Sequence, residues 1–289
     1  MVFVTQLIFY FLFIIPPHKG ISYTAYQLES PKIYVFAFVT VLITLGGYLI
    51  NDYFDIETDK INDKSRLSPK SLLLLYFVIL FLGFILAFAL ALALGQPALS
   101  LIYLMAVALL YMYSAIWKRQ VLIGNVIVSL FTAAVPLILL YAERDQLDML
   151  NVTSIESTTS SIVFFSAFTF LISMVREIIK DIEDLEGDSA AGYKTLPIVY
   201  GIERAKTIAG FYGFVLIGTL LLWQFYSLRF TSDNLLTHLF VFIFLYAPVI
   251  FLVVKLLGNS AHWTSLSQLC KAIMLFGLLL IIIIKCNYN

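Results

Sequence analysis

The sequence predicts an all-α integral membrane protein with nine transmembrane helices, and three observations support this fold class. Hydrophobic residues make up 61% of the 289-residue chain and charged residues 12%, so the chain is far more apolar than an ordinary soluble domain. The mean hydropathy of +0.96 gives the same indication. The apolar residues also form runs of membrane length, separated by stretches that carry charged or turn residues. We expect residues 1–289 to form a single transmembrane domain.

Nine apolar runs predict the individual spans. Each run is bounded by charged residues or by residues that favour turns, and together they cover residues 2–15, 33–50, 71–94, 98–116, 121–141, 159–176, 207–228, 235–254 and 266–285. The first run lacks the basic region and the small-residue cleavage site of a signal peptide. We therefore interpret it as a span, which Pro16 and Pro17 end.

The connections between the runs refine this prediction. The Gly-Gln-Pro stretch at 95–97 predicts a tight hairpin between the third and fourth spans. Residues 142–160 are polar and rich in Ser and Thr, which predicts a mobile loop. The last run is uncharged only between Lys271 and Lys285, so it spans a membrane if these lysines extend to the interface or if the helix begins near Leu266.

An acidic stretch follows the second run, which carries no charge between residues 33 and 50. Residues 51–59 read Asn-Asp-Tyr-Phe-Asp-Ile-Glu-Thr-Asp, and carboxylates at the end of a membrane span are costly to place and often functional. If the helix continues, Asn51, Asp55 and Asp59 lie on one of its faces at intervals of four residues. Like charges at this spacing repel each other unless a cation lies among them.

A second acidic stretch follows the sixth run. Residues 176–188 read Arg-Glu-Ile-Ile-Lys-Asp-Ile-Glu-Asp-Leu-Glu-Gly-Asp, and the expected helical stripe comprises Glu177, Asp181, Asp184 and Asp188. One such cluster is commonly only a solvated helix end paired with Lys or Arg. Two clusters with helical register at the ends of two spans instead favour one shared ionic site.

The distribution of Lys and Arg predicts the orientation of the spans. With nine spans, the loops after spans 2, 4, 6 and 8 lie on one side of the membrane. Of the 18 Lys and Arg residues, twelve lie in these loops, five lie on the other side, and Lys271 lies within the last run. The positive-inside rule therefore predicts a multi-pass protein of the cell membrane with both acidic stretches facing the cytoplasm.

The two acidic stretches predict a magnesium-dependent diphosphate site. Mg²⁺ prefers oxygen ligands and often joins one or two carboxylates to a substrate phosphate. Two acidic helix faces can hold a diphosphate between metal ions, and nearby Lys and Arg side chains can neutralise a highly charged leaving group. Because a water-soluble diphosphate does not require nine spans, the pattern favours a diphosphate carried on a long lipid.

Other classes of function have little support in the sequence. The formal net charge of zero gives no indication of a nucleic-acid partner. Cys270 and Cys286 lie in or beside the last run, which favours buried thiols over a disulfide or a metal site. The three histidines are scattered, at positions 18, 238 and 262, and form no ligand pair.

These residues resemble the motifs of the UbiA superfamily of intramembrane prenyltransferases. The stretch at 51–59 matches Asn-Asp-x-x-Asp-x-x-x-Asp, and the stretch at 184–188 matches Asp-x-x-x-Asp, with Asp181 just upstream. Tyr113 and Lys118 resemble the Tyr/Lys loop motif of the superfamily. The resemblance covers nearly the whole chain.

The resemblance implies a bundle of nine helices around a central cavity, with Mg²⁺ as cofactor, an isoprenyl diphosphate as donor and membrane lipids as surroundings. It implies that the catalytic carboxylates are Asp55, Asp59, Asp181, Asp184 and Asp188, and that these residues bind the metal together with Asn51. The residues expected to bind the diphosphate are Arg66, Lys118, Arg176 and Lys180. The residues expected to bind substrate are Tyr113 and Asn125.

Within the superfamily, the stretch at 176–188 is most similar to the digeranylgeranylglyceryl phosphate synthase branch, as is the stretch at 51–62. That branch transfers a geranylgeranyl group to a hydroxyl of geranylgeranylglyceryl phosphate, so the resemblance implies a lipid acceptor. The sequence departs from the branch at 63–69, which reads Asp-Lys-Ser-Arg-Leu-Ser-Pro. Of the usual Arg-Pro-rich stretch, only Arg66 is retained there.

Three alternatives remain open at this point. The acceptor could be an aromatic quinone precursor, such as dihydroxynaphthoate or 4-hydroxybenzoate. The protein could be a membrane cation transporter, although its acidic clusters lie at span ends and not at interruptions near the midplane. It could also be a non-catalytic scaffold of the same fold, although its acidic motifs are intact.

Overall fold

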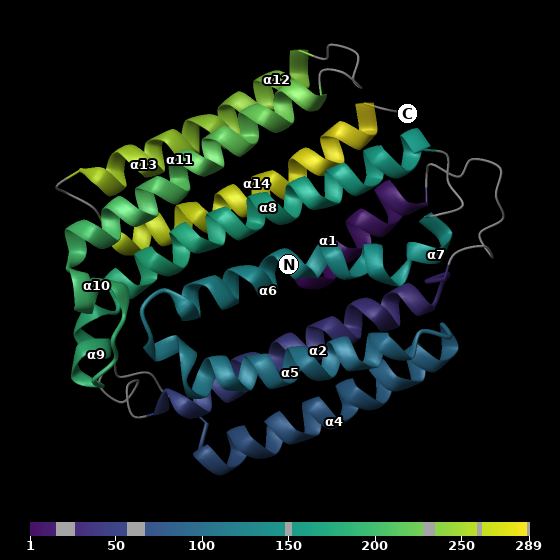
Figure 1. Cartoon of the computed structure of the whole chain (residues 1–289), viewed down its shortest axis with the longest axis horizontal. Coiled ribbons are helices and arrows are strands. Elements are labelled where there is room, and N and C mark those ends of the chain that lie inside the picture. Colours follow the sequence, from purple (N-terminus) through teal and green to yellow (C-terminus); the bar gives the residue numbers. More distant parts are fainter. Residues whose placement is uncertain (16–26, 57–66, 148–151, 228–234, 259–261, 288–289) are drawn as a thin grey trace. The chain divides into compact units, whose positions relative to one another are not determined.

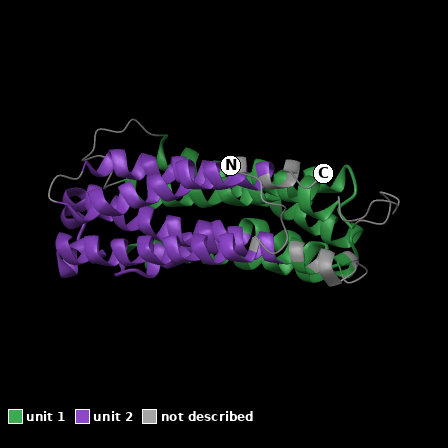
Figure 2. Ribbon diagram, turned by 90° about the horizontal axis from the view of Figure 1, so that it is seen from above, with its two compact units in different colours: residues 1–119, 135–159 green, residues 120–134, 160–289 purple. Residues whose placement is uncertain are grey.

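The structure is a computed structural model that describes residues 1–15, 27–56, 67–147, 152–227, 235–258 and 262–287 (Figure 1). All regular secondary structure in these ranges is helical. The chain divides into two compact units, coloured separately in Figure 2. Unit 1 comprises residues 1–119 and 135–159, and unit 2 comprises residues 120–134 and 160–289. Each unit is described by itself below.

The helices follow one another along the chain. They are α1 (Val2–Phe9), the π-helix η1 (Tyr10–Ile14), α2 (Lys32–Phe54), α4 (Pro69–Ala93), α5 (Pro97–Ala115), the 3₁₀ turn η4 (Trp117–Arg119), α6 (Ile123–Ala142), α7 (Arg144–Leu147), α8 (Val152–Glu183), α9 (Leu185–Ala190), α10 (Leu196–Tyr200), α11 (Ile202–Ser227), α12 (Leu235–Val241), the π-helix η5 (Phe242–Tyr246), α13 (Ala247–Leu257) and α14 (Trp263–Asn287).

The helices confirm the predicted multi-pass membrane fold. In the part of the chain that the structure describes, 8 helical segments are long and apolar enough to cross a membrane, and Val2–Ile14 forms a shorter apolar helix. These segments coincide with the nine predicted runs. The last span begins at Trp263, close to the expected start near Leu266, so the helix is longer than its uncharged stretch.

The prediction of a loop over residues 142–160 is wrong for most of this stretch. Arg144–Leu147 forms α7, and α8 begins at Val152. Thr158 shows why this Ser- and Thr-rich segment is compatible with a buried helix. Its side chain is only 2% exposed, and its hydroxyl donates to the Phe13 carbonyl at 3.1 Å. Polar side chains that find such acceptors can be buried at little cost.

In unit 1, α2 packs against α1, α4 and α5 (Figure 1). A Cβ atom at Gly46 of α2 would lie 2.7 Å from a methyl carbon of Leu80 on α4, so the absence of a side chain permits this close approach. The predicted hairpin between α4 and α5 is confirmed. Its Gly95 has φ +65°, a left-handed conformation that favours glycine.

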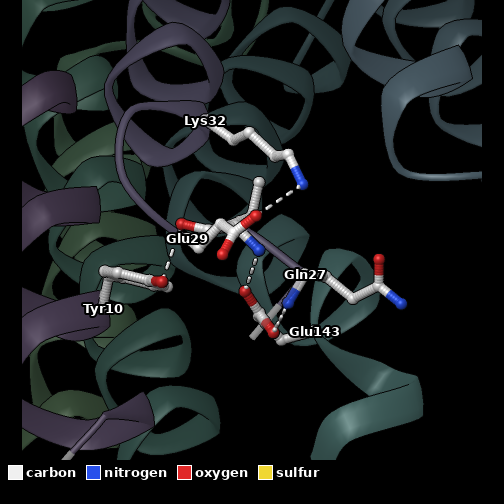
Figure 3. A network of polar contacts seen from close by, with 6 residues as sticks. Tyr10, Gln27, Glu29, Lys32 and Glu143 are labelled. Atoms are coloured by element: carbon white, nitrogen blue, oxygen red, sulfur yellow. Dashed lines mark hydrogen bonds and ion pairs between the residues drawn. The ribbon is translucent and has the colours of Figure 1, made fainter. Parts of the chain in front are cut away.

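A buried carboxylate fixes the turn that precedes α2 (Figure 3). Glu143, which follows α6, is 0% exposed and accepts hydrogen bonds from the backbone N–H groups of Leu28 at 2.7 Å and Gln27 at 3.2 Å. The Tyr10 hydroxyl donates to the Leu28 carbonyl at 2.7 Å. Burial raises the pKa of Glu143 above its ordinary value, while the two N–H groups and the charge of Lys32 oppose the shift. This network joins η1, the turn and the end of α6.

In unit 2, α8 is the most deeply buried of the spans, because 67% of its apolar window lies inside the protein. It packs closely on α14 at Gly277, where a Cβ atom would lie 2.3 Å from the buried ring of Phe168. Figure 1 shows α14 beside α8 along this stretch. This close packing fixes α8 against α14, and α8 contains most of the second acidic stretch.

Candidate active site

The first acidic stretch forms a cluster in unit 1 with a lysine from another helix. We call Asn51, Asp55 and Lys118 the first-motif cluster. The Asn51 Nδ2 group donates to Asp55 Oδ2 at 2.9 Å, which confirms that these residues share one helix face. Lys118 Nζ donates to Asn51 Oδ1 at 3.2 Å and also contacts Asp55 Oδ2 as an ion pair. The Lys118 and Asp55 side chains are only 17% and 13% exposed.

Local chain geometry positions the members of the first-motif cluster. Helix α2 ends at Phe54, and Asp55 caps it with its N–H donating to the Asn51 carbonyl at 3.0 Å. Helix α5 ends at Ala115, where Ile116 leaves the helical conformation with φ −130°. The chain then forms the short turn η4, which brings Lys118 to the end of α2.

The second acidic stretch forms a cluster in unit 2 with a residue of α6. We call Asn125, Arg176, Glu177 and Asp181 the second-motif cluster. The Asn125 Nδ2 group donates to Asp181 Oδ2 at 2.9 Å, and Asn125 is 6% exposed. A nearly buried amide therefore holds one oxygen of a carboxylate that the sequence assigns to the metal.

Arg176 and Glu177 form an ion pair at the same end of α8. Arg176 NH1 lies 2.5 Å from Glu177 Oε1, and their side chains are 25% and 12% exposed. The Nε atom of Arg176 is buried and has no hydrogen-bond partner within the described residues. A buried guanidinium donor without an acceptor is a costly feature that an anionic ligand would relieve.

The remaining residues of the second stretch continue the helix past its formal end at Glu183. The Asp184 N–H donates to the Lys180 carbonyl and the Asp188 N–H to the Asp184 carbonyl, both at 2.9 Å. Asp184 and Asp188 therefore follow Asp181 in helical register, although α8 gives way to α9 between them. The Asp181 carboxylate lies within electrostatic reach of Glu177, Lys180 and Asp188.

Two expected site residues lie outside the described residues, and two others lie on α5 and α8. Asp59 and Arg66 fall in the undescribed range 57–66. Tyr113 is half-buried in the last turn of α5, and Lys180 is exposed on α8.

The donor atoms of the first-motif cluster fit the expected Mg²⁺. Asp55 Oδ1 is buried and has no hydrogen-bond partner within the described residues, so this carboxylate has an oxygen available for a cation. Asn51 supplies an amide oxygen, which is also a ligand type that Mg²⁺ accepts. Within the described ranges, no three His, Cys, Asp or Glu side chains come close enough together to hold a metal ion by themselves. The fit therefore rests on carboxylate and amide oxygens together with the phosphate oxygens of a substrate.

Sequence reasoning did not identify three of the contacts at the clusters. Lys118 was expected to bind the diphosphate, and the structure pairs it with Asp55. Glu177 was part of the predicted stripe, but its pairing with Arg176 was not expected. Asn125 was expected to bind substrate, and the structure brings it to Asp181. The charge alternation at 176–177 was the one signal that could have indicated the ion pair. No local pattern could have indicated a contact between residues that are 56 positions apart.

Comparisons with known proteins agree with the arrangement of helices and motifs. Residues 13–276 match the UbiA prenyltransferase family. The digeranylgeranylglyceryl phosphate synthase of Pyrococcus abyssi is 36% identical over 227 residues, which cover 72% of this chain and 75% of the relative. The protein of that name from Methanopyrus kandleri is 30% identical over 250 residues, which cover 83% of each chain.

The fold has a solved counterpart. A structure from work on digeranylgeranylglyceryl phosphate synthase in membranes is 25% identical to this chain and superimposes with a TM-score of 0.66. The similarity covers 98% of this chain and 92% of the other.

Proposed function

Because the chain belongs to the UbiA prenyltransferase family, we propose that it transfers a geranylgeranyl group from its diphosphate to geranylgeranylglyceryl phosphate. Relatives that are 30% to 36% identical to the chain carry the name digeranylgeranylglyceryl phosphate synthase, which supports this donor and this acceptor. In the reaction, the bond between the allylic carbon and the diphosphate oxygen breaks, and the diphosphate leaves with the electron pair. The acceptor hydroxyl oxygen then forms an ether bond to that carbon and releases its proton.

The observation that carries the proposal is the incomplete pairing of two buried groups at the acidic stretches. Asp55 Oδ1 and Arg176 Nε are buried without hydrogen-bond partners in the described part of the chain, one as an acceptor and the other as a donor. A carboxylate oxygen suits a metal ion and a guanidinium N–H suits a phosphate oxygen, so each group suits one component of a magnesium diphosphate.

We assign the residues as follows. The metal ligands are Asn51, Asp55, Asp59, Asp181, Asp184 and Asp188, and the cations that neutralise the diphosphate are Arg66, Lys118, Arg176 and Lys180. Bound Mg²⁺ would supply Lewis-acid stabilisation of the departing diphosphate. We assign Tyr113 to the substrate, where its aromatic face would stabilise positive charge on the allylic carbon. The apolar spans exclude water, which would otherwise capture that carbon.

A panel of acceptors tests the proposed function. We expect purified protein with Mg²⁺ and labelled geranylgeranyl diphosphate to prenylate geranylgeranylglyceryl phosphate, and to leave dihydroxynaphthoate and 4-hydroxybenzoate unchanged. An acceptor phosphate needs its own cation, and the exposed candidates are Arg119, Lys194 and Arg204. Neutralising the one that binds the acceptor should raise the acceptor KM and leave the donor KM unchanged. Efficient prenylation of an aromatic acid, with no product from the lipid, would disprove the acceptor assignment.

We also propose that both acidic stretches face the cytoplasm, as the excess of Lys and Arg in the adjoining loops indicates. Single cysteines introduced at positions 63 and 190, in a variant without native cysteines, should react with a membrane-impermeant maleimide only from the cytoplasmic side. A cysteine at position 150 should react only from the opposite side. Labelling of positions 63 and 190 from different sides would rule out a common diphosphate site.

A further inference from the structure

We propose that Lys118 exchanges partners during the binding of substrate, leaving Asp55 when the metal ion binds and pairing with the diphosphate instead. This inference rests on the proposed function, because it concerns the metal and the diphosphate of that reaction. In the proposed exchange, the Lys118 ammonium group makes the binding of the metal ion and the binding of the donor diphosphate depend on each other.

The competition arises because Lys118 contacts the same oxygen atoms that a metal ion requires. Its Nζ atom donates to Asn51 Oδ1 at 3.2 Å and pairs with Asp55 Oδ2. These are the two residues of the first-motif cluster with oxygen ligands for Mg²⁺. An ammonium group and a divalent cation that contact the same oxygen atoms lie close enough to repel each other strongly in a partly buried site. The two therefore cannot use these oxygens together.

Lys118 also stabilises the first-motif cluster before the metal binds. Asp55 lies at the end of a membrane span and its side chain is 13% exposed, so an unpaired charge there would be costly. The ion pair with Lys118 and the hydrogen bond from Asn51 at 2.9 Å stabilise the carboxylate. Lys118 therefore acts as a built-in counter-ion of Asp55.

The exchange can proceed stepwise because only one of the two carboxylate oxygens of Asp55 has a partner in the described residues. Lys118 and Asn51 both contact Oδ2, while Oδ1 is buried without a partner in the described residues. An incoming cation can bind Oδ1 first and then displace the ammonium group from Oδ2. Lysine has a flexible four-carbon stem, so the displaced ammonium can turn towards a phosphate without movement of the backbone.

The exchange predicts opposite effects on metal and on donor when Lys118 is removed. Without the competing ammonium, the first-motif cluster should bind a metal ion more tightly when no diphosphate is present. The diphosphate should bind more weakly, because it loses a cation. Since coupling between two ligands is reciprocal, the ability of metal to promote diphosphate binding should also fall.

Binding of Mn²⁺, followed by electron paramagnetic resonance on the full-length protein in detergent, tests the first effect. We expect Lys118→Gln to bind Mn²⁺ about tenfold more tightly than the wild type in the absence of diphosphate, as loss of a charged hydrogen-bond partner implies. Lys70→Gln is the matched control, because it removes an exposed lysine at the start of α4 in the same unit. It should leave the Mn²⁺ affinity unchanged.

A second measurement uses the wild-type protein and so does not depend on a variant folding. Pulse labelling of lysines with acetic anhydride, read by mass spectrometry, should modify Lys118 faster when Mg²⁺ is added. Inorganic pyrophosphate added together with Mg²⁺ should then protect Lys118, while labelling of Lys70 stays constant throughout.

The outcomes separate this inference from the proposed function. If Lys118→Gln binds Mn²⁺ no more tightly than the wild type, or if Mg²⁺ does not change the labelling of Lys118, the exchange does not occur and the prenyltransfer proposal stands. If neither protein binds Mn²⁺, the metal requirement of the proposed reaction fails and the exchange fails with it.

Discussion

Replacing Asp55 with asparagine, or Asp184 with alanine, is expected to lower the rate of prenyl transfer at least about 100-fold while the protein remains folded. Each change removes a negative oxygen from the proposed metal site, and removal of one group that stabilises transition-state charge typically costs about 10²–10³ in rate. Asparagine is chosen at position 55 because its amide oxygen can still accept from Lys118, which avoids a buried unpaired ammonium. Product formation from labelled geranylgeranyl diphosphate at saturating Mg²⁺ measures the loss.

The matched control for Asp184 is Glu186→Ala. Glu186 is an exposed carboxylate in the first turn of α9, two residues after Asp184, which is the N-cap residue of that short helix, and Glu186 has no assigned role at the metal. Its loss should leave the rate within about twofold of the wild type, since changes at exposed positions are usually small. Near-normal turnover of either aspartate variant would show that the acidic stretches do not hold the metal.

Replacing Asn125 with alanine is expected to raise the Mg²⁺ concentration needed for half-maximal activity about 10- to 100-fold, the usual effect of losing a group that orients a metal ligand. The Asn125 amide donates to Asp181 Oδ2 at 2.9 Å and is nearly buried, so it fixes the direction of this carboxylate. We therefore regard Asn125 as a positioning residue. The readout is a Mg²⁺ titration of the rate, which a loss of stability alone would not shift.

Ser129→Ala provides the comparison on the same helix. Ser129 lies one turn after Asn125, is 0% exposed, and its hydroxyl has no hydrogen-bond partner among the described residues. Removing this hydroxyl breaks no described contact, so the Mg²⁺ dependence should be unchanged. An Asn125→Ala variant that responds to Mg²⁺ as the wild type does would limit Asn125 to a structural role.

Local patterns in the sequence were sufficient to predict the spans and one contact of the first-motif cluster. The hydrogen bond between Asn51 and Asp55 follows from their spacing of four residues on a helix. The membrane spans follow from the length of the apolar runs. The hydrogen bond depends only on residues within one helix, and each span depends only on how one helix interacts with the surrounding membrane.

The contacts that complete the clusters could not be predicted in this way. Lys118 is 63 positions from Asp55, and its placement depends on where α5 ends and how η4 turns. Residues 152–158 were misjudged for a related reason. Their Ser and Thr content favours a loop in isolation, whereas Thr158 finds its acceptor on Phe13, which is 145 positions away. Tertiary contacts of this kind decide between local alternatives.

The hydrogen bonds that Glu143 accepts from the turn before α2 can form only after α6 has been synthesised. Leu28 and Glu143 are 115 positions apart, so the ribosome completes α2, α4, α5 and α6 before this carboxylate exists. The turn before α2 thus gains its final anchor only after the whole of α2 has been synthesised. A nascent chain that stops short of residue 143 would contain every residue of the first-motif cluster without the group that fixes the entry to α2.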